Sequence, residues 1–286
     1  MKKKRITAAL LALGLSAVTI CSQLPVFAAE ETAQATDTAA QPQTADPSVV
    51  TTNGIDGWPQ ASDISSEAAV VMENTTNTIL YSKNADEVLF PGSTVKIMTC
   101  LLALENTQLT DEVTMTATGV SGVTDGGASI SSQVDEVFTV EQCLYAIMVA
   151  SANDIALQIA EHVGGSVDGF VQQMNTRAQE LGCTNTVFTN PTGLPDDNQH
   201  TTAHDMALIM QAAIQNESFR TIAAATSYTI PATNKAAARN LTSKFTMTDT
   251  GSTGFYEGCI GGKEVIRKLR KYTGMCSPAK WHDSDQ

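Results

Sequence analysis

The chain has 286 residues, 42% of them hydrophobic and 5% aromatic, and its formal net charge at pH 7 is −13. A surface this acidic repels nucleic acid and anionic lipid, so electrostatic binding to either is excluded. The length is sufficient for one domain with a sizeable core and for shorter segments beside it.

The first 28 residues have the pattern of a secretory signal peptide. Basic residues at positions 2–5 precede an apolar run over positions 6–20, and small residues follow as far as Ala28 and Ala29. The apolar run is short for a transmembrane helix, so an uncleaved membrane anchor is the weaker alternative. We expect cleavage after Ala28 and export to the cell envelope, outside the cytoplasm. Cleavage would remove four positive charges and change the net charge from −13 to −17.

The next segment, residues 29–62, is rich in Ala, Thr, Gln, Asp and Pro and has few large apolar residues. It can bury too little surface to offset the entropy lost on ordering, so we expect a flexible linker. Residues 63–263 would then form one domain, followed by a basic tail at residues 264–286.

The cysteines predict free thiols. Five remain after the signal peptide: Cys100, Cys143, Cys183, Cys259 and Cys276. An odd number does not describe a disulfide framework, and Cys100 and Cys143 lie in apolar segments, so buried thiols are expected. His200 and His204 are four residues apart but lack a third ligand, so we expect neither a metal site nor a cofactor.

Alternating apolar residues at the start of the domain predict a β-hairpin, with strands at 69–72 and 78–81. After the break at Pro91-Gly92, apolar residues at helical spacing predict a buried helix from Ser93 to Glu105. Further helices are expected at 140–149, 154–163, 167–181 and 202–216, and strands at 226–230 and 254–263. This order predicts an α+β fold in which one antiparallel sheet, built from both ends of the chain, packs against helices.

Ser93 and Lys96 have the spacing of a serine nucleophile and its base. Side chains three residues apart share one face of a helix, so Lys96 would reach Ser93. A serine hydroxyl needs a base at neutral pH, and a lysine can be that base only if burial or a nearby cation lowers its pKa. A helix N-terminus at Ser93 would also supply N–H groups to a developing oxyanion. Taken alone, Ser93 would more often be an ordinary N-cap residue.

A second polar motif, Ser151-Ala152-Asn153-Asp154, falls at a break between two predicted apolar helices. Its side chains could therefore point into a cleft. Ser151 would relay a proton between Lys96 and a leaving amine, and Asn153 would hold Lys96 and bind a substrate amide. The alternative is that these side chains only cap the second helix, a role that suits Asp154.

With four further segments in the same order, these motifs make the chain resemble the low-molecular-mass penicillin-binding proteins of the serine D-Ala-D-Ala carboxypeptidase type, peptidase family S11. The resemblance runs from about Ser65 to Lys263. The segments that carry it are Tyr81-Ser82-Lys83-Asn84-Ala85-Asp86, Pro91-Gly92-Ser93-Thr94-Val95-Lys96-Ile97-Met98-Thr99, Ser151-Ala152-Asn153-Asp154, Asn190-Pro191-Thr192-Gly193-Leu194-Pro195, Thr229-Ile230-Pro231-Ala232-Thr233-Asn234 and Tyr256-Glu257-Gly258. Serine β-lactamases share Ser-x-x-Lys, but the segments at Ser151 and Asn190 are similar to those of the carboxypeptidases.

The resemblance implies a β-lactamase/DD-peptidase-like fold with a helical subdomain. It implies removal of the terminal D-Ala from peptidoglycan stem peptides through an acyl-enzyme on Ser93, and covalent inhibition by penicillins and other β-lactams. Lys96 and Ser151 would be catalytic, and Asn153 and Lys263 would bind substrate. The activity would belong to cell wall organisation and cell shape.

The family's third motif, Lys-Thr-Gly on the strand beside the nucleophile, is altered in this chain. Its Lys and Thr bind the substrate's terminal carboxylate. Lys263 is present, but Glu264 and Val265 replace Thr and Gly. A carboxylate about 4 Å from the substrate's own would cost about 4 kcal/mol at an effective dielectric of about 20, or about a thousandfold in binding or rate.

The 23 residues after Lys263 differ in composition from the domain. They contain five Lys or Arg, against eight in residues 29–263, and show no strand-like alternation. Family members continue here with further strands, a closing helix and usually a β-rich domain that ends in a membrane-binding helix. We expect these parts, including the membrane anchor, to be missing because of a reading-frame change. If the codons of residues 264–286 are read with a shift of one nucleotide, they can encode a sequence that looks like the family's next strand and turn. The coding DNA would test this hypothesis.

The sequence therefore predicts a truncated serine D-Ala-D-Ala carboxypeptidase of the cell wall or periplasm. A serine β-lactamase or a transpeptidase is the alternative among enzymes, and the released product distinguishes them. The alternative of another class is a catalytically inactive wall-binding homologue, or a pseudogene product whose lost strands expose a sheet edge.

Overall fold

The structure, a computed structural model, describes residues 51–52, 64–123, 127–266 and 271–276, with side chains described only within 64–264. The predicted signal peptide and all of the predicted linker except Thr51 and Thr52 lie outside these residues. The described residues all belong to one compact unit, residues 45–286.

A three-stranded antiparallel sheet begins the domain, in the order β1 (Thr51–Thr52), β3 (Ile79–Lys83), β2 (Ala69–Met72). The predicted hairpin is β2 and β3. Its turn is closed by Glu73, whose carboxylate accepts hydrogen bonds from the backbone N–H groups of Thr75 and Thr76 at 2.9 and 2.6 Å. With the hydroxyls of the same threonines, these bonds lower the pKa of Glu73 to about 2. The pairing of β1 with β3 shows that the predicted linker is not wholly without structure.

The described residues form eight helical segments between the hairpin and the C-terminal strands. They are the 3₁₀ turn η1 (Gly92–Val95) and the helices α1 (Lys96–Asn106), α2 (Ala117–Ser121), α3 (Val140–Val149), α4 (Asn153–Gly164), α5 (Val167–Glu180), α6 (Ala203–Ala213) and α7 (Glu217–Ala224). The four helices predicted between residues 140 and 216 are α3 to α6, with ends within three residues of the expected ones. The sequence prediction missed α2 and α7, which are short.

Polar caps decide where several helices begin. Thr139 and Gln142 form a reciprocal capping box at the start of α3, in which each side chain accepts from the other residue's backbone N–H. Ser166 and Thr202 each accept one backbone N–H at the start of α5 and α6. Such caps stabilise a helix by ~1 kcal/mol each. The start of α3 at Val140 follows from this chemistry.

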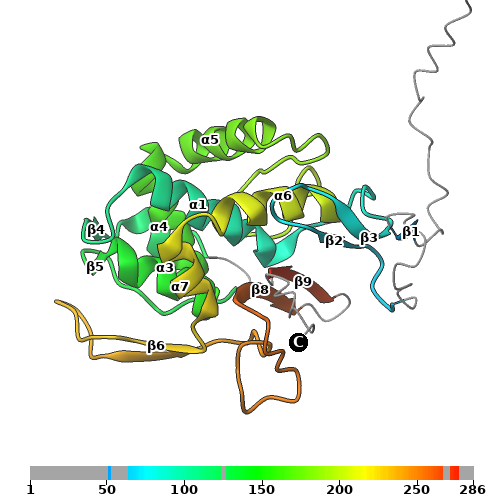
Figure 1. Ribbon diagram of the computed structural model, residues 1–286. Helices are drawn as coiled ribbons and strands as arrows, with labels where there is room; N and C mark the ends of the chain where they lie inside the picture. Colours follow the sequence, from blue (N-terminus) through cyan, green and yellow to red (C-terminus); the bar gives the residue numbers. More distant parts are fainter. Residues whose placement is uncertain (1–50, 53–63, 124–126, 267–270, 277–286) are drawn as a thin grey trace, which may run out of the picture. The chain divides into compact units, whose positions relative to one another are not determined.

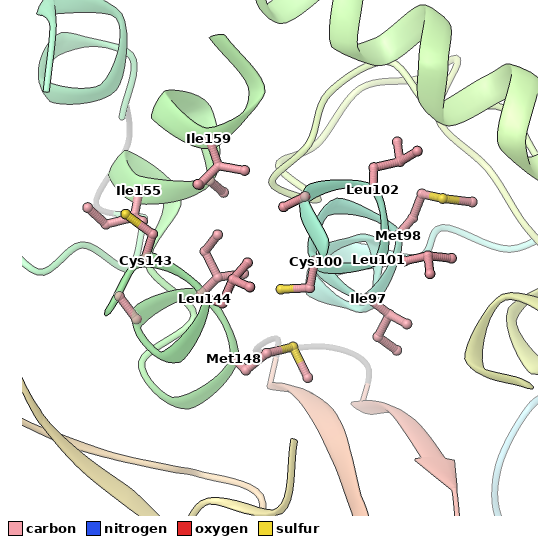
Figure 2. Packing of buried hydrophobic residues seen from close by; sticks show 14 of the residues in the cluster. Ile97, Met98, Cys100, Leu101, Leu102, Cys143, Leu144, Met148, Ile155 and Ile159 are labelled. Carbon is pink, nitrogen blue, oxygen red and sulfur yellow. The ribbon is translucent and has the colours of Figure 1, made fainter. Parts of the chain in front are cut away.

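The core is centred on α1, which contacts α3, α4, α5, α6 and α7 (Figure 1). Eight of its eleven residues are buried. Figure 2 shows the Cys100 thiol of α1 pointing toward Leu144 of α3. Full burial of one such side chain stabilises the fold by ~2 kcal/mol, so α1 is held firmly, and with it the residues at its N-terminal end.

The cysteines behave as predicted. Cys100, Cys143 and Cys183 are buried free thiols, and Cys259 is partly exposed. Burial raises the pKa of Cys100 and of Cys183 to about 12, which leaves both thiols protonated and unreactive. The side chain of Cys276 lies outside the described residues.

Three two-stranded antiparallel sheets complete the described fold: β4 (Glu112–Thr114) with β5 (Val137–Thr139), β6 (Ser227–Ile230) with β7 (Arg239–Thr242), and β8 (Gly261–Ile266) with β9 (Lys271–Cys276). The fold is α+β, as predicted. Within the described residues, however, strands from the two ends of the chain form separate sheets. The prediction had placed the strands from the two ends of the chain in one hydrogen-bonded sheet. In the structure helix α6 contacts both β2 and β9 instead.

Strand β9 corrects one expectation about the tail. The composition after Lys263 gave no strand-like alternation, yet β8 continues to Ile266 and pairs in register with β9, from Gly261 opposite Cys276 to Ile266 opposite Lys271. A two-residue alternation need not appear where a hairpin packs on other elements, as β8 does on η1 and α7. No helix among the described residues has both the length and the apolar character needed to cross a bilayer.

Candidate active site

Ser93 lies in η1, the 3₁₀ turn that leads into α1. Pro91, Gly92 and Thr94 beside it are buried, whereas Ser93 is partly exposed. Neither η1 nor α1 has a side-chain cap, so the alternative in which Ser93 is an ordinary N-cap residue is wrong. The α-helix itself begins at Lys96, one turn later than predicted. The serine hydroxyl is therefore available on the surface of the turn.

Lys96 is fully buried beneath this turn and makes three polar contacts through its Nζ atom. Nζ lies 3.5 Å from Ser93 Oγ, 2.6 Å from Asn153 Oδ1 and 2.5 Å from the carbonyl oxygen of Thr192. Desolvation, together with the positive charge of Lys263, lowers the pKa of Lys96 well below its usual range. The structure thus places a lysine with an accessible neutral form within reach of the serine.

Ser151 and Asn153 lie at the junction of α3 and α4. Asn153 is the first residue of α4, and its backbone N–H donates to the carbonyl of Ala128 at 2.7 Å. Ser151 has a left-handed backbone, with φ of 59°, a conformation that costs ~1 kcal/mol for a residue other than glycine. Among the described residues the Ser151 hydroxyl has no hydrogen-bond partner. The structure brings Asn153 to Lys96 but leaves Ser151 beside them without a direct bond.

Asp154 does not cap α4, which corrects the alternative considered for this motif. The N-cap of α4 is Ala152 and has no side-chain hydrogen bond. The buried carboxylate of Asp154 instead accepts from Ser129 Oγ at 2.7 Å, from Ser132 Oγ at 2.8 Å and from the backbone N–H groups of Ile130 and Ser132 at 3.3 and 3.1 Å. It fixes the loop 128–132 against the start of α4, so it supports the segment that holds Asn153.

The segment 190–194 holds the other side of Lys96, a role that the sequence prediction missed. Asn190 Oδ1 accepts from the backbone N–H groups of Thr192 and Gly193 and from the Thr192 hydroxyl, at 2.7 to 3.1 Å. This turn directs the Thr192 carbonyl at Lys96. Gly193 has φ of 77°, and a Cβ atom there would lie 1.8 Å from the carbonyl oxygen of Gly92. The two backbones therefore touch at Gly92 and Gly193.

Lys263 approaches the site from β8. Its Nζ is buried and donates to the carbonyl of Met148 at 3.1 Å. A cavity of about 60 Å³ lies here, lined by Ala128, Met148, Val149, Ala150, Ser151, Thr242, Ser243, Lys244, Phe245, Lys263 and Glu264. Ser151 and Lys263 therefore line one cavity. The positive charge of Lys263 also helps to lower the pKa of Lys96. All five residues predicted for the site come together in this region, from η1, α1, α4, β8 and the turn before α4.

The variant Lys263→Met is expected to raise the free energy of unfolding at neutral pH by ~2 kcal/mol. Burial lowers the pKa of Lys263 to about 8, whereas an unfolded lysine titrates at about 10.4. Between these values the unfolded chain binds more protons, so the unchanged protein gains stability as the pH rises. Below both pKa values the buried positive charge of Lys263 destabilises the folded state, and a methionine at this position lacks that charge. Urea unfolding at about pH 7 and about pH 9.5 measures both effects.

Lys235→Met is the matched control because Lys235 is exposed, lies 3.9 Å from Asp135 and is not among the charges that act on the pKa of Lys263. It should leave the pH dependence of unfolding unchanged. An equal pH dependence in Lys263→Met and the unchanged chain would contradict the prediction.

The comparisons with known proteins agree with this geometry. Residues 56–263 match the family described as D-alanyl-D-alanine carboxypeptidase, Peptidase_S11. The D-alanyl-D-alanine carboxypeptidase DacF of Bacillus subtilis is 38% identical over 166 residues, which are 56% of this chain and 42% of that protein. The D-alanyl-D-alanine carboxypeptidase of Streptomyces sp. strain K15 is 32% identical over 218 residues, 73% of this chain and 75% of that protein.

Solved structures give the same result for the fold. The Streptomyces K15 DD-transpeptidase aligns with a TM-score of 0.67 at 28% identity, covering 73% of this chain and 83% of that chain. A D-alanyl-D-alanine carboxypeptidase from Mycobacterium tuberculosis also aligns with a TM-score of 0.67, at 26% identity. The chain spans about two fifths of the Bacillus relative, with 42% of it covered. Since the family match covers well over half of the chain, the protein belongs to the D-alanyl-D-alanine carboxypeptidase family, peptidase family S11.

Proposed function

We propose that the chain is a serine D-Ala-D-Ala carboxypeptidase that removes the terminal D-Ala from peptidoglycan stem peptides through an acyl-enzyme on Ser93. One observation carries the proposal: the buried Nζ of Lys96 lies 3.5 Å from Ser93 Oγ and is held by Asn153 and Thr192. The lowered pKa of Lys96 supports its role as the base, because only neutral lysine accepts a proton.

Each residue has a role in the reaction. Ser93 Oγ attacks the carbonyl carbon of the penultimate D-Ala while its proton passes to Lys96 Nζ. The peptide C–N bond then breaks, and Ser151 relays a proton to the leaving amine of the terminal D-Ala. Water hydrolyses the resulting ester and regenerates the Ser93 hydroxyl. Asn153 positions Lys96 and binds a substrate amide, and Lys263 adds positive charge beside the substrate.

The family also supports the proposed setting of the reaction. The Bacillus and Streptomyces relatives carry the name D-alanyl-D-alanine carboxypeptidase, and we place the corresponding reaction of this chain on the stem peptides of peptidoglycan. Peptidoglycan lies outside the cytoplasm, as the predicted signal peptide requires. β-Lactams would acylate Ser93 in the same way as substrate, and they are the proposed covalent inhibitors.

Labelling of the purified chain with a fluorescent penicillin, followed to completion, tests the proposal. We expect one label per chain, located by mass spectrometry on the peptide that contains Ser93, and none on Ser93→Ala. Ser227→Ala is the matched control because Ser227 is exposed on β6, and it should be labelled normally. Folded protein that takes no label would favour an inactive homologue, and rapid release of opened penicillin would favour a β-lactamase.

A further inference from the structure

The hydroxyl of Thr99 makes a hydrogen bond outside its own helix. A threonine inside a helix can donate to a carbonyl of the same helix one turn earlier. Thr99 lies in α1 and is fully buried, yet its hydroxyl donates to the carbonyl of Pro191 at 2.8 Å, 92 residues away in the chain. This bond ties the turn 190–194 to the helix that begins with Lys96.

The bond to Thr99 locates this turn on α1. The peptide group between Pro191 and Thr192 is planar. Its carbonyl accepts from Thr99, and its N–H donates to Asn190 Oδ1 at 3.1 Å. The N–H of the next peptide group, that of Gly193, donates to the same Asn190 oxygen at 2.8 Å. Asn190 is part of the turn, so it shapes the turn, whereas the Thr99 bond fixes the turn to the helix.

The group that is located in this way is the carbonyl of Thr192. It accepts from Lys96 Nζ at 2.5 Å, and Asn153 Oδ1 accepts from the same Nζ at 2.6 Å. Ser93 Oγ lies farther away, at 3.5 Å. A neutral amine has two N–H groups and one lone pair. When the two nearer oxygens accept both N–H groups, the lone pair is left for the proton of the serine hydroxyl.

We propose that Thr99 is a positioning residue, which holds the Thr192 carbonyl on Lys96 and so turns the lone pair of the neutral amine toward the nucleophile. This inference rests on the proposed function, because it concerns the base of the same reaction. Without the Thr99 hydroxyl the turn would lose its hydrogen bond to α1. The amine could then rotate an N–H toward the serine, an orientation in which it accepts no proton.

Acylation of Ser93 by a fluorescent penicillin, measured across pH, tests this role. Thr99→Val keeps a similar shape but has no hydroxyl, and we expect its plateau rate to be about tenfold lower than that of the unchanged chain. The rise of the rate should also move to lower pH. A carbonyl that accepts from the charged amine favours the charged form, so its loss lowers the pKa of Lys96 further. Thr99→Ser retains the donor and should restore both the rate and its pH profile.

A second measurement follows the base itself and needs no acylation. The NMR chemical shift of the Lys96 Cε atom, recorded across pH, reports the protonation of this amine, and Lys96→Met identifies the signal. Lys263, Cys100 and Asp154 also act on the pKa of Lys96, and none of them is changed in Thr99→Val. A titration at lower pH in this variant therefore reports the loss of the carbonyl.

Thr107→Val is the matched control. Thr107 caps the other end of α1, where its hydroxyl donates to the carbonyl of Ala103 at 2.7 Å. This variant also loses one bond between a hydroxyl and a carbonyl, and it should leave the acylation rate, its pH profile and the Lys96 titration unchanged. Urea unfolding shows which variants are folded. If Thr99→Val does not fold, the smaller Thr99→Ala takes its place in the same comparison.

Three results would overturn the inference: an unchanged rate and titration in folded Thr99→Val, a loss of rate without a shift in pH, or a loss that Thr99→Ser shares. The label on Ser93 tests the proposed function separately. A labelled chain whose Lys96 titration does not respond to Thr99→Val fails the inference alone. An unlabelled chain whose Lys96 titration does respond fails the proposed reaction alone.

Discussion

Replacing Lys96 with methionine is expected to reduce the rate of Ser93 acylation by penicillin by about a thousandfold. Methionine has a similar length but cannot accept a proton. The serine would then rely on water, which is a much weaker base than neutral lysine. Stopped-flow or gel-based labelling of the purified variant measures the acylation rate.

The pH profile separates this chemical role from a structural one. Since neutral Lys96 is the active form, the rate in the unchanged chain should rise as the pH passes upward through the lowered pKa of Lys96 and then reach a plateau. Lys96→Met should lose that rise. Lys263→Met should move it to higher pH, because the charge of Lys263 is one of the causes that lower the pKa of Lys96.

The control is Lys235→Met. Lys235 is an exposed lysine that lies 3.9 Å from Asp135 in an ion pair, and its loss should leave the acylation rate and its pH profile unchanged. Far-UV circular dichroism and urea unfolding would show that Lys96→Met is folded. A folded Lys96→Met chain that is acylated at the original rate would rule out Lys96 as the base.

Loss of the Asp154 carboxylate is expected to lower the free energy of unfolding by ~3 kcal/mol in Asp154→Ala. The carboxylate is buried and accepts four hydrogen bonds from Ser129, Ile130 and Ser132. Alanine would leave these donors without a partner, and the loop 128–132 would lose its attachment to α4. Urea unfolding measures the change as a lower midpoint with an unchanged slope.

Asp168→Ala is the control for this experiment. Asp168 is an exposed carboxylate in the first turn of α5, where its interaction with the helix dipole is worth ~0.5 kcal/mol. Similar losses in the two variants would show that the Asp154 network contributes little. The acylation rate of Asp154→Ala gives a second result, since a freed loop should also loosen the position of Asn153.

Local chemistry explains which elements could be predicted from the sequence. The bounds of α3 matched the prediction because apolar spacing coincides there with a Thr139 cap. The separation of the β1-β3-β2 and β8-β9 sheets could not be predicted, since strand pairing depends on long-range register rather than on either segment's composition. Strand β9 was missed for the same reason: its partner β8, rather than its own alternation, makes it a strand.

The site was predicted in part. Ser93 and Lys96 were predicted because side chains three residues apart share one helix face, and Asn153 was predicted from a polar motif at the break between two apolar helices. Thr192 was missed because it acts through a backbone carbonyl, 96 residues from Lys96, and no side-chain property indicates that. The left-handed Ser151 and the loop attachment by Asp154 are also consequences of tertiary packing. The reading-frame change after Lys263 stays a prediction that the coding DNA would test.

The contact between Gly92 and Gly193 has a consequence for how this site could vary in evolution. The carbonyl oxygen of Gly92 fills the space where a side chain at position 193 would begin. A contact between two main-chain segments therefore positions the turn that carries the serine. Substitutions of the surrounding side chains would leave this turn in place. Gly193 cannot be exchanged, and no second substitution on the facing segment can make room, because the atom that a side chain would meet belongs to the main chain. This glycine is therefore expected to persist even in descendants that have lost the reaction but still fold.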